Sequence, residues 1–215
     1  MGQRLRVTFS RGEAMKYLSH LELMRMWERV FRRAGWHLAY SQGFNPHPRF
    51  SFAVPLPVGV AGEAELLELY LDEARPLDEA AEQLRGQLPK GAGVVRVDEV
   101  PDTAPSMQRQ LVGAEYVATC PPLSSVEALR GETARMMGAS ALPRQRIKEG
   151  KARSYDLRPM IHSLEVQCAD ERPAVVKMDL RTDAAGAGRP DEVLRELGIE
   201  PAECHITRTR LIFRD

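Results

Sequence analysis

The sequence predicts an α+β protein made of tandem ferredoxin-like (βαββαβ) units with antiparallel sheets. Three observations favour this fold class. Strand-like and helix-like periods follow one another in the order β-α-β-β-α-β along the first hundred residues. A similar order returns after a polar, proline-bearing segment at 101–106. Finally, two segments of the first half, SHLE and ARPLDEAAEQLRG, have counterparts in SSVE and GRPDEVLRELG. We therefore expect domains at 1–103 and 104–215.

The first half opens with a strand and a helix whose ends are marked by local signals. Apolar and polar residues alternate from Arg4 to Ser10, which is typical of a strand. Ser19 and Glu22 then form a capping box, the sign of a helix N-terminus. The helix is expected to end at Gly35, and one face carries the apolar residues Leu23, Trp27, Val30, Phe31 and Ala34.

The remaining elements follow from alternation and from breaking residues. In the first half we expect extended segments at 37–40 and 49–54, a loop at 43–48, a strand at 65–71, a helix after Pro76 and a strand at 94–100. In the second half we expect a strand at 115–119, a helix opened by a capping box of Ser124 and Glu127, strands at 161–167 and 175–180, a helix from Pro190 and a last strand at 204–213.

Composition limits the class of protein. The chain has 215 residues, 43% of them hydrophobic, and 30 basic residues balance 30 acidic ones. Wholesale disorder is therefore excluded, and any site for an anion must come from the local distribution of charge. The cysteines Cys120, Cys168 and Cys204 lie far apart without a CxxC pair, so we expect buried free thiols rather than a disulfide or a zinc site. We find no signal segment or membrane span and expect a cytoplasmic protein.

Two segments are rich in cations. Arg25, Arg29, Arg32 and Arg33 recur at helical spacing, with Lys16 just upstream, and a row of guanidinium groups suits phosphate. The alternative is an ordinary solvated helix face with a Glu28–Arg32 pair. The second segment is expected to form a hairpin with its tip at Gly150, suited to gripping a nucleic-acid backbone or otherwise simply a solvated loop. Its cations are Arg144, Arg146, Lys148, Lys151, Arg153 and Arg158.

The segment SQGFNPHPRFSF combines turn residues, cations and aromatic rings. The prolines at 46 and 48 hold His47 in an extended backbone, and an exposed aromatic ring beside cations is suited to stacking on an unpaired base. Phe50 and Phe52 are expected in the core of the following strand. His20 and His47 are candidate general bases, and with Tyr17 and Tyr40 they could form a metal-free ribonuclease site. Otherwise His20 is a solvated residue at the helix start.

Established catalytic motifs are absent. The sequence has no GxGxxG, no P-loop, no HExxH, no GxSxG and no cluster of acids, histidines and cysteines with metal-ligand spacing. It has no CxxxCxxC, so this chain cannot hold the iron–sulfur cluster of a radical S-adenosylmethionine enzyme. No metal and no cofactor are expected in this chain.

Five motifs together resemble the radical SAM-linked domain, a bacterial family. They are SHLELMR, RRAG, YSQGFNPHP, PLPVG and the later KEGKARSYDLRP. One departure is Glu22, where the family usually has aspartate. The resemblance implies a partner protein, separate from this free-standing chain, that uses S-adenosylmethionine and an iron–sulfur cluster, and it implies RNA-related gene company. The site candidates that match the signature are His20, Tyr40, Ser41, Gly43, Asn45, His47 and Arg49, and Phe44 lies among them.

These observations lead to three hypotheses. The first is a non-catalytic module that binds structured RNA, tRNA or rRNA, for a separate modification enzyme. The second is a metal-independent endoribonuclease that uses His20 or His47, by analogy with the tandem ferredoxin-like layout of CRISPR repeat-processing nucleases and some pseudouridine synthases. The third is a protein-interaction subunit with no affinity for RNA, in which the phenylalanine-rich loop is the docking surface.

Overall fold

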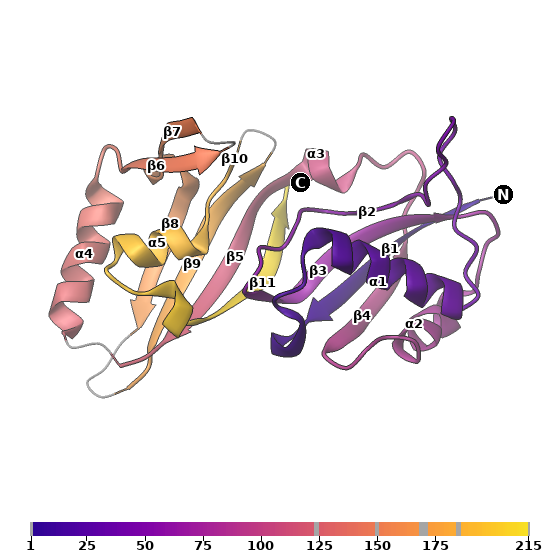
Figure 1. Ribbon diagram of the computed structural model, residues 1–215, viewed down its shortest axis with the longest axis horizontal. Coiled ribbons are helices and arrows are strands. Elements are labelled where there is room, and N and C mark those ends of the chain that lie inside the picture. Colours follow the sequence, from indigo (N-terminus) through magenta and orange to yellow (C-terminus); the bar gives the residue numbers. More distant parts are fainter. Residues whose placement is uncertain (1, 123–124, 149–150, 168–171, 184–185, 215) are drawn as a thin grey trace. The chain divides into compact units, whose positions relative to one another are not determined.

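The computed structural model describes residues 2–122, 125–148, 151–167, 172–183 and 186–214. The chain divides into two compact units, Met1–Gln110 and Leu111–Asp215, and both have the predicted α+β, ferredoxin-like architecture (Figure 1). The division therefore lies a few residues beyond the position expected from the sequence. The difference is a short helix, α3 (Met107–Gln110), whose Met107 is fully buried, while the Gln108 side chain donates to the Phe52 carbonyl at 2.8 Å.

The strands of the first unit pair in the order β4-β1-β3-β2, and every pair is antiparallel. This order is that of a ferredoxin-like fold, because the first and third strands lie in the middle of the sheet. The bounds are β1 (Gln3–Arg11), β2 (Phe50–Phe52), β3 (Val60–Leu71) and β4 (Ala92–Glu99). A 3-10 turn, η1 (Glu13–Met15), follows β1.

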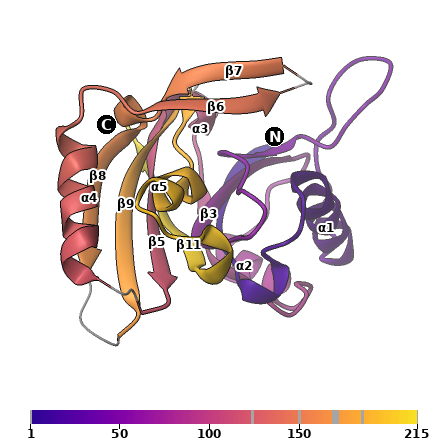
Figure 2. The ribbon, with the colours of Figure 1, turned by 60° about the vertical axis from the view of Figure 1, so that its left-hand side comes forward.

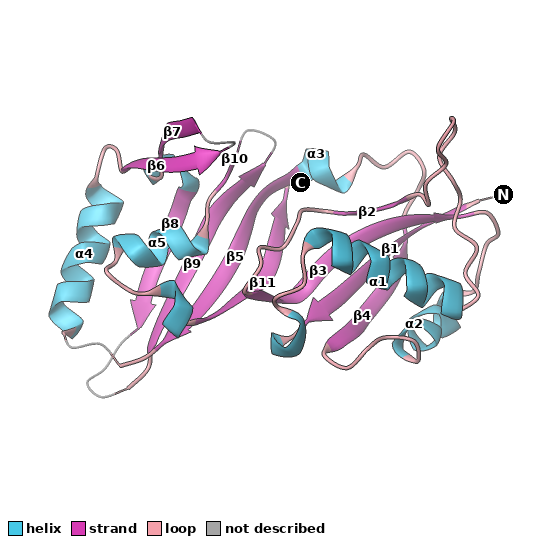
Figure 3. Ribbon diagram, viewed as in Figure 1, coloured by secondary structure: helices cyan, strands magenta, loops and turns pink. Residues whose placement is uncertain are grey.

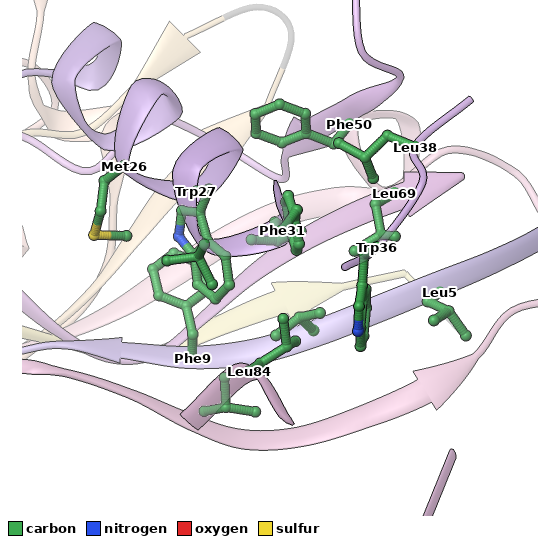
Figure 4. Close-up of a cluster of buried hydrophobic side chains, with 14 of the residues drawn as sticks. Leu5, Phe9, Met26, Trp27, Phe31, Trp36, Leu38, Phe50, Leu69 and Leu84 are labelled. Carbon is green, nitrogen blue, oxygen red and sulfur yellow. The ribbon is translucent and has the colours of Figure 1, made fainter. Parts of the chain in front are cut away.

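Two helices, α1 (His20–Arg33) and α2 (Leu77–Arg85), share one hydrophobic core with this sheet (Figure 4). Alternate residues of β1 and β3 point into that core, because side chains along a strand alternate between its two faces. Trp27 of α1 lies edge-on to Phe9 of β1, with ring centroids 5.1 Å apart. Such aromatic pairs add about 0.5–1.5 kcal/mol beyond the area they bury. The expectation that Phe50 and Phe52 are core residues is confirmed.

The other face of β1 carries a buried ion network. The Glu68 carboxylate accepts from the guanidinium groups of both Arg4 (2.7 Å) and Arg6 (2.6 Å), and Glu68 is only 4% exposed. Arg4 also donates to the carbonyls of Pro101 and Ala104, which fastens the segment after β4 against the sheet. Removing one partner of such a network typically costs about 3–5 kcal/mol, because a buried charge is left without compensation.

The second unit repeats the arrangement, with strand order β11-β5-β9-β8 and antiparallel pairing throughout. A two-stranded hairpin, β6 paired with β7, is inserted between α4 and β8, and Figure 3 shows it apart from the main sheet. The bounds are β5 (Leu111–Cys120), α4 (Val126–Gly138), β6 (Pro143–Lys148), β7 (Lys151–Asp156), η2 (Arg158–Met160), β8 (Ile161–Gln167), β9 (Ala174–Asp183), β10 (Gly186–Ala187), α5 (Pro190–Glu196), η3 (Pro201–Glu203) and β11 (His205–Phe213).

One helix start differs from the sequence prediction. The N-cap of α4 is Ser125, whose hydroxyl accepts from the Ala128 N–H at 3.2 Å. The predicted cap, Ser124, lies outside the described residues. Two serines stand side by side at this point, and local spacing alone cannot tell which of them adopts the extended backbone that a cap requires.

The prediction of free thiols is wrong for two of the three cysteines. Cys120, at the end of β5, and Cys204, just before β11, are joined in a disulfide, and both are buried. These residues are 84 positions apart in the sequence, yet the pairing of β5 with β11 brings their Cα atoms to 4.3 Å. Spacing in the sequence cannot reveal such a neighbourhood. Cys168 lies outside the described residues.

Candidate functional site

The arginines of α1 form an exposed row, as their spacing predicts. We call Arg25, Arg29, Arg32 and Arg33 the arginine face; all four are exposed, and none makes a salt bridge with another described residue. The Glu28–Arg32 pair that was the alternative interpretation is not formed. Surface arginines elsewhere do find carboxylates: Arg85 pairs with Glu82 at 2.9 Å. The arginine face is therefore a local excess of positive charge in a chain of zero net charge.

The turn after α1 positions the next segment. Gly35 has φ +68°, a backbone that favours glycine, and the Trp36 N–H donates back to the Phe31 carbonyl at 2.9 Å. This closure directs the Trp36 ring onto Phe31, with ring centroids 6.0 Å apart. The chain from 37 to 41 then runs beside the end of β3, where the Ala39 N–H donates to the Tyr70 carbonyl at 2.7 Å.

Residues 41–48 form a closed loop, which we call the 41–48 loop. Ser41 closes it twice: its N–H donates to the His47 carbonyl (2.9 Å), and its hydroxyl accepts from the His47 N–H (3.0 Å). Gly43 has φ +128°, a conformation that side chains rarely adopt. The pattern YSQGFNPHP is thus explained by the geometry of the loop, which holds its polar side chains outward.

The side chains of the 41–48 loop face solvent. Phe44 is fully exposed (106%), and Asn45 and His47 are exposed as well. Arg49, immediately after the loop, lies over the Tyr70 ring with its guanidinium carbon 3.9 Å from the ring centroid. The Phe44 ring packs against no other described part of the first unit, which is unusual for a phenylalanine, and it is therefore available to a partner.

A pocket of about 540 Å³ lies between the end of α1, the segment after it and the end of β3. Phe31, Trp36 and Leu38 line it from the side of the core, and Figure 4 shows all three among the buried hydrophobic side chains. Tyr40 and Pro48 line it where the 41–48 loop begins and ends, and Tyr40 is 55% exposed. The volume is within the range of ligand pockets, which spans about 300–1,000 Å³.

The same pocket carries charges that are not neutralised by their neighbours. Glu28 and Arg32 from α1, His37 from the segment after it and Asp72 from beyond β3 all line it. Among the described residues, none of these four side chains makes a hydrogen bond or an ion pair. A polar group on an aromatic wall without a partner in its own chain is suited to bind a ligand.

The candidate catalytic histidines lie at opposite ends of α1. His20 is the first residue of the helix, and its ring packs edge-on to Phe52 at 5.5 Å. His47 belongs to the 41–48 loop, whose Pro48 lines the pocket at the other end of the helix. Because a 14-residue helix is about 20 Å long, the two histidines do not form one site. Within the described part of the chain, no three histidine, cysteine or acidic side chains gather as metal ligands do.

The expected basic hairpin forms, with β6 and β7 side by side (Figure 2). Its register pairs Arg146 with Arg153 and Lys148 with Lys151, so cations occupy positions directly across from one another. Like charges directly opposite one another are in general unfavourable in a two-stranded ribbon. The side chains of these four residues, and the predicted tip at Gly150, lie outside the described residues.

Three predicted contact residues are engaged within the chain. The Lys16 ammonium donates to Glu13 at 2.8 Å. Arg144 pairs with Glu196 of α5. Arg158 donates to the carbonyls of Met137 and Ile161, at 2.9 and 2.8 Å.

The DLRP motif is accordingly structural. Asp156 accepts from the N–H groups of Leu142 and Arg158, Leu157 is buried, and Arg158 connects the end of α4 with β8. The sequence placed Arg158 among the RNA-binding candidates because it belongs to a basic run. Nothing in that run indicates that its guanidinium donates to backbone carbonyls of the same chain.

Of the residues that line the pocket, only Arg32 and Tyr40 were site candidates from the sequence; the others, among them Glu28, Trp36, His37 and Asp72, were missed. Glu28 was considered only as the partner of an i,i+4 pair. His37 and Asp72 are brought together by a backbone bond, Asp72 N–H to the His37 carbonyl at 3.1 Å, between segments 35 residues apart. No local sequence signal indicates that the segment after α1, which carries Trp36 and His37, lies beside the end of β3.

The geometry defines a tandem ferredoxin-like protein with an arginine-lined helix and a charged aromatic pocket. The chain belongs to the family described as "uncharacterized protein conserved in bacteria" (DUF2344), which matches residues 4–190. No curated protein sequence matches it.

The solved structures that match this chain share little sequence with it. A chain in the crystal structure of a Cbf5–Nop10–Gar1 complex has a TM-score of 0.50 at 10% identity, with 96% of this chain and 48% of that chain covered. This chain thus spans about half the length of that relative. The small subunit of acetolactate synthase from Thermotoga maritima (TM-score 0.28, 10% identity, 99% and 95% covered) and a putative glycine cleavage system transcriptional repressor (0.26, 11%, 100% and 99%) also match. Among the described residues, no helix has the length and apolar character needed to cross a bilayer.

Proposed function

We propose that this protein is a non-catalytic module that binds structured RNA, tRNA or rRNA, for a separate modification enzyme in the bacterial cytoplasm. The arginine face carries this proposal. Four neighbouring guanidinium groups without salt bridges among the described residues form the kind of surface that grips a phosphate backbone, because each can make a bidentate, permanently charged contact.

Two further features support contact with RNA. The fully exposed Phe44 offers a face on which an unpaired base can stack, and stacking of this kind contributes about 1–3 kcal/mol per base. The second basic run forms an antiparallel hairpin, a ribbon suited to gripping a nucleic-acid backbone.

The partner in this proposal is a radical S-adenosylmethionine protein that holds its own iron–sulfur cluster. The signature motifs support this part of the proposal through their resemblance to the radical SAM-linked domain. In this arrangement the partner performs the chemistry, and this chain selects and holds the substrate. The separation of His20 from His47 favours such a division of labour over a two-histidine ribonuclease.

A protein-docking role is the second candidate, and Phe44 favours it. A fully exposed phenylalanine within a closed loop is also typical of a contact with another protein. Phe44→Ala separates the two roles. Loss of partner co-purification with unchanged RNA affinity assigns the loop to protein contact.

The decisive experiment measures fluorescence anisotropy of labelled total small RNA at low and moderate salt. We expect the dissociation constant to rise steeply with salt. In a plot of log Kd against log salt concentration, each phosphate contact should add about 0.7 to 0.9 to the slope. The double charge reversal Arg25→Glu with Arg29→Glu should weaken binding at least tenfold and reduce that slope by about 2, since each phosphate contact contributes about one unit.

The matched control reverses two exposed arginines of the second unit, Arg130→Glu with Arg172→Glu. This control changes the net charge by the same amount but leaves the arginine face intact. Its RNA affinity should stay within about twofold of the parent, because salt screens exposed charges that are distant from the binding surface. Equal affinity of the Arg25/Arg29 variant and the parent would contradict the proposal, as would RNA cleavage that is abolished by His47→Ala.

A further inference from the structure

The pocket beside the arginine face has features that phosphate binding does not require. Its inner side is aromatic and apolar, from Phe31, Trp36 and Leu38, and its opening is flanked by the half-exposed ring of Tyr40. Two carboxylates, Glu28 and Asp72, and one guanidinium, Arg32, line it as well. The two carboxylates outnumber the one guanidinium, so the pocket is less suited to a phosphate group than the arginine face outside it.

The charges within the pocket do not cancel one another. Glu28 and Arg32 lie four residues apart on α1, the spacing at which a glutamate and an arginine ordinarily pair, yet they make no salt bridge. Asp72 likewise has no side-chain partner among the described residues. Each carboxylate is therefore free to accept hydrogen bonds from a ligand, while Arg32 continues the arginine face to the pocket itself.

We propose that this pocket binds an unpaired guanine base. This inference rests on the proposed function and names the nucleotide that the RNA-binding surface selects. A planar base fits a slot with an aromatic ring, Tyr40, at its opening, because every base can stack on such a ring. Guanine presents two adjacent donors, N1–H and the 2-amino group, which match the two oxygens of one carboxylate, from Glu28 or Asp72.

The other bases match less well. Adenine presents an acceptor, N1, where guanine has a donor, so a carboxylate repels it. Uracil has one donor between two acceptors. A site built to hydrogen-bond a donor discriminates strongly against an analogue that lacks it, since the acceptor is then left unpaired. Arg32 is placed to contact the phosphate of the bound nucleotide, and the rest of the arginine face is placed for its neighbours.

The test uses the full-length protein with fluorescein-labelled octauridylates that carry guanosine, inosine or adenosine at one central position. We expect the guanosine probe to bind at least tenfold more tightly than the adenosine probe, with inosine between them because it lacks the 2-amino group. Guanosine 5′-monophosphate should also change the fluorescence of Trp36, which lines the pocket, whereas Trp27 is buried away from it.

Substitutions identify the groups. Glu28→Gln and Asp72→Asn remove one charge each from exposed side chains, so the fold should persist. The variant that lacks the base-binding carboxylate should lose the guanosine preference and keep the parent affinity for the adenosine probe. Tyr40→Ala should weaken both probes by a similar factor. Tyr17→Ala, which removes another exposed tyrosine that does not line the pocket, is the control and should change neither.

The outcomes separate this inference from the proposed function. Equal affinity for the guanosine and adenosine probes, or a preference that survives in the Glu28→Gln/Asp72→Asn double variant, overturns the guanine assignment. If salt-dependent binding of total RNA persists in that case, the RNA-binding function stands without it. If guanosine 5′-monophosphate binds in a Tyr40-dependent way but no RNA does, the pocket assignment stands and the proposed function fails.

Discussion

At the scale of single residues, the first turn of α1 shows how local chemistry sets a side chain's charge. The Ser19 hydroxyl donates to the Glu22 carboxylate at 2.7 Å, and the Ser19 N–H donates to the same oxygen at 2.8 Å. These bonds, the side-chain bond first, lower the pKa of Glu22 below its ordinary value, and Arg25 contributes in the same direction. The Glu22 side chain is long enough to reach back to the cap, so the capping box is complete.

Substitution of Ser19 by alanine should raise the pKa of Glu22 toward its ordinary value. A lowered native-state pKa stabilises the fold above the unfolded pKa, near 4.3, and that stabilisation is lost as pH falls through the native value. Carboxyl chemical shifts of Glu22 followed by NMR from pH 7 to pH 2 measure the change. Ser125→Ala, which removes the cap of α4, is the control and should leave Glu22 unaffected. A Glu22 titration that is identical with and without the Ser19 hydroxyl would contradict this account.

At the scale of elements, the basic hairpin is anchored at its base. Tyr155 of β7 donates its hydroxyl to Glu192, and Arg144, its partner across the ribbon, pairs with Glu196 one turn further along α5. The like-charged pairs lie toward the other end of the ribbon. The contacts made at the base therefore attach this end of the ribbon to α5.

The anchor makes a pH prediction. Burial, and then the bond to Glu192, raise the pKa of Tyr155 to about 12. A raised native-state pKa means that the anchor is fully stabilising below the unfolded value, near 10, and is lost as pH rises through about 12. Ultraviolet titration of tyrosinate should show a late step that is absent in Tyr155→Phe and shifted to lower pH in Glu192→Gln. Glu203→Gln, an exposed glutamate near the end of α5, should not move it; a late step unchanged by Glu192→Gln would rule out the anchor.

At the scale of the whole molecule, each ferredoxin-like unit is held by contacts between residues far apart in the sequence. The first unit has the Arg4–Glu68–Arg6 network, and the second has the Cys120–Cys204 bond. That bond spans most of the second unit, so it restricts the unfolded chain strongly in the chain-entropy description. The two units therefore rely on different chemistry for the same topology, one on charge and one on a covalent link.

Reduction of this bond should lower the free energy of unfolding of the second unit by about 2–4 kcal/mol. Urea unfolding with and without a thiol reductant measures the difference, and mass spectrometry after alkylation without reduction counts the free thiols. The Cys168→Ser variant should respond to the reductant as the parent does, and Cys120→Ser should not respond. Alkylation of all three cysteines in the unreduced protein would contradict the bond.

Most helices and strands could be predicted from the sequence, because their signals are local. Alternation along β1, the capping box of α1, the glycine after it and the proline at the start of α5 each act within a few residues. The exposed arginine face followed from helical spacing in the same way. These features depend on neighbours in the chain, so the order of residues is sufficient to determine them.

The tertiary structure alone decided which of the candidate residues are available to a ligand. It joined Cys120 to Cys204, turned Arg158 inward to backbone carbonyls and separated His20 from His47. It also assembled the pocket, where Glu28 of a helix meets Asp72 from beyond a strand. The physical reason is that these contacts join positions tens of residues apart, and only the pairing of strands and the packing of helices on them brings such positions within reach of one another.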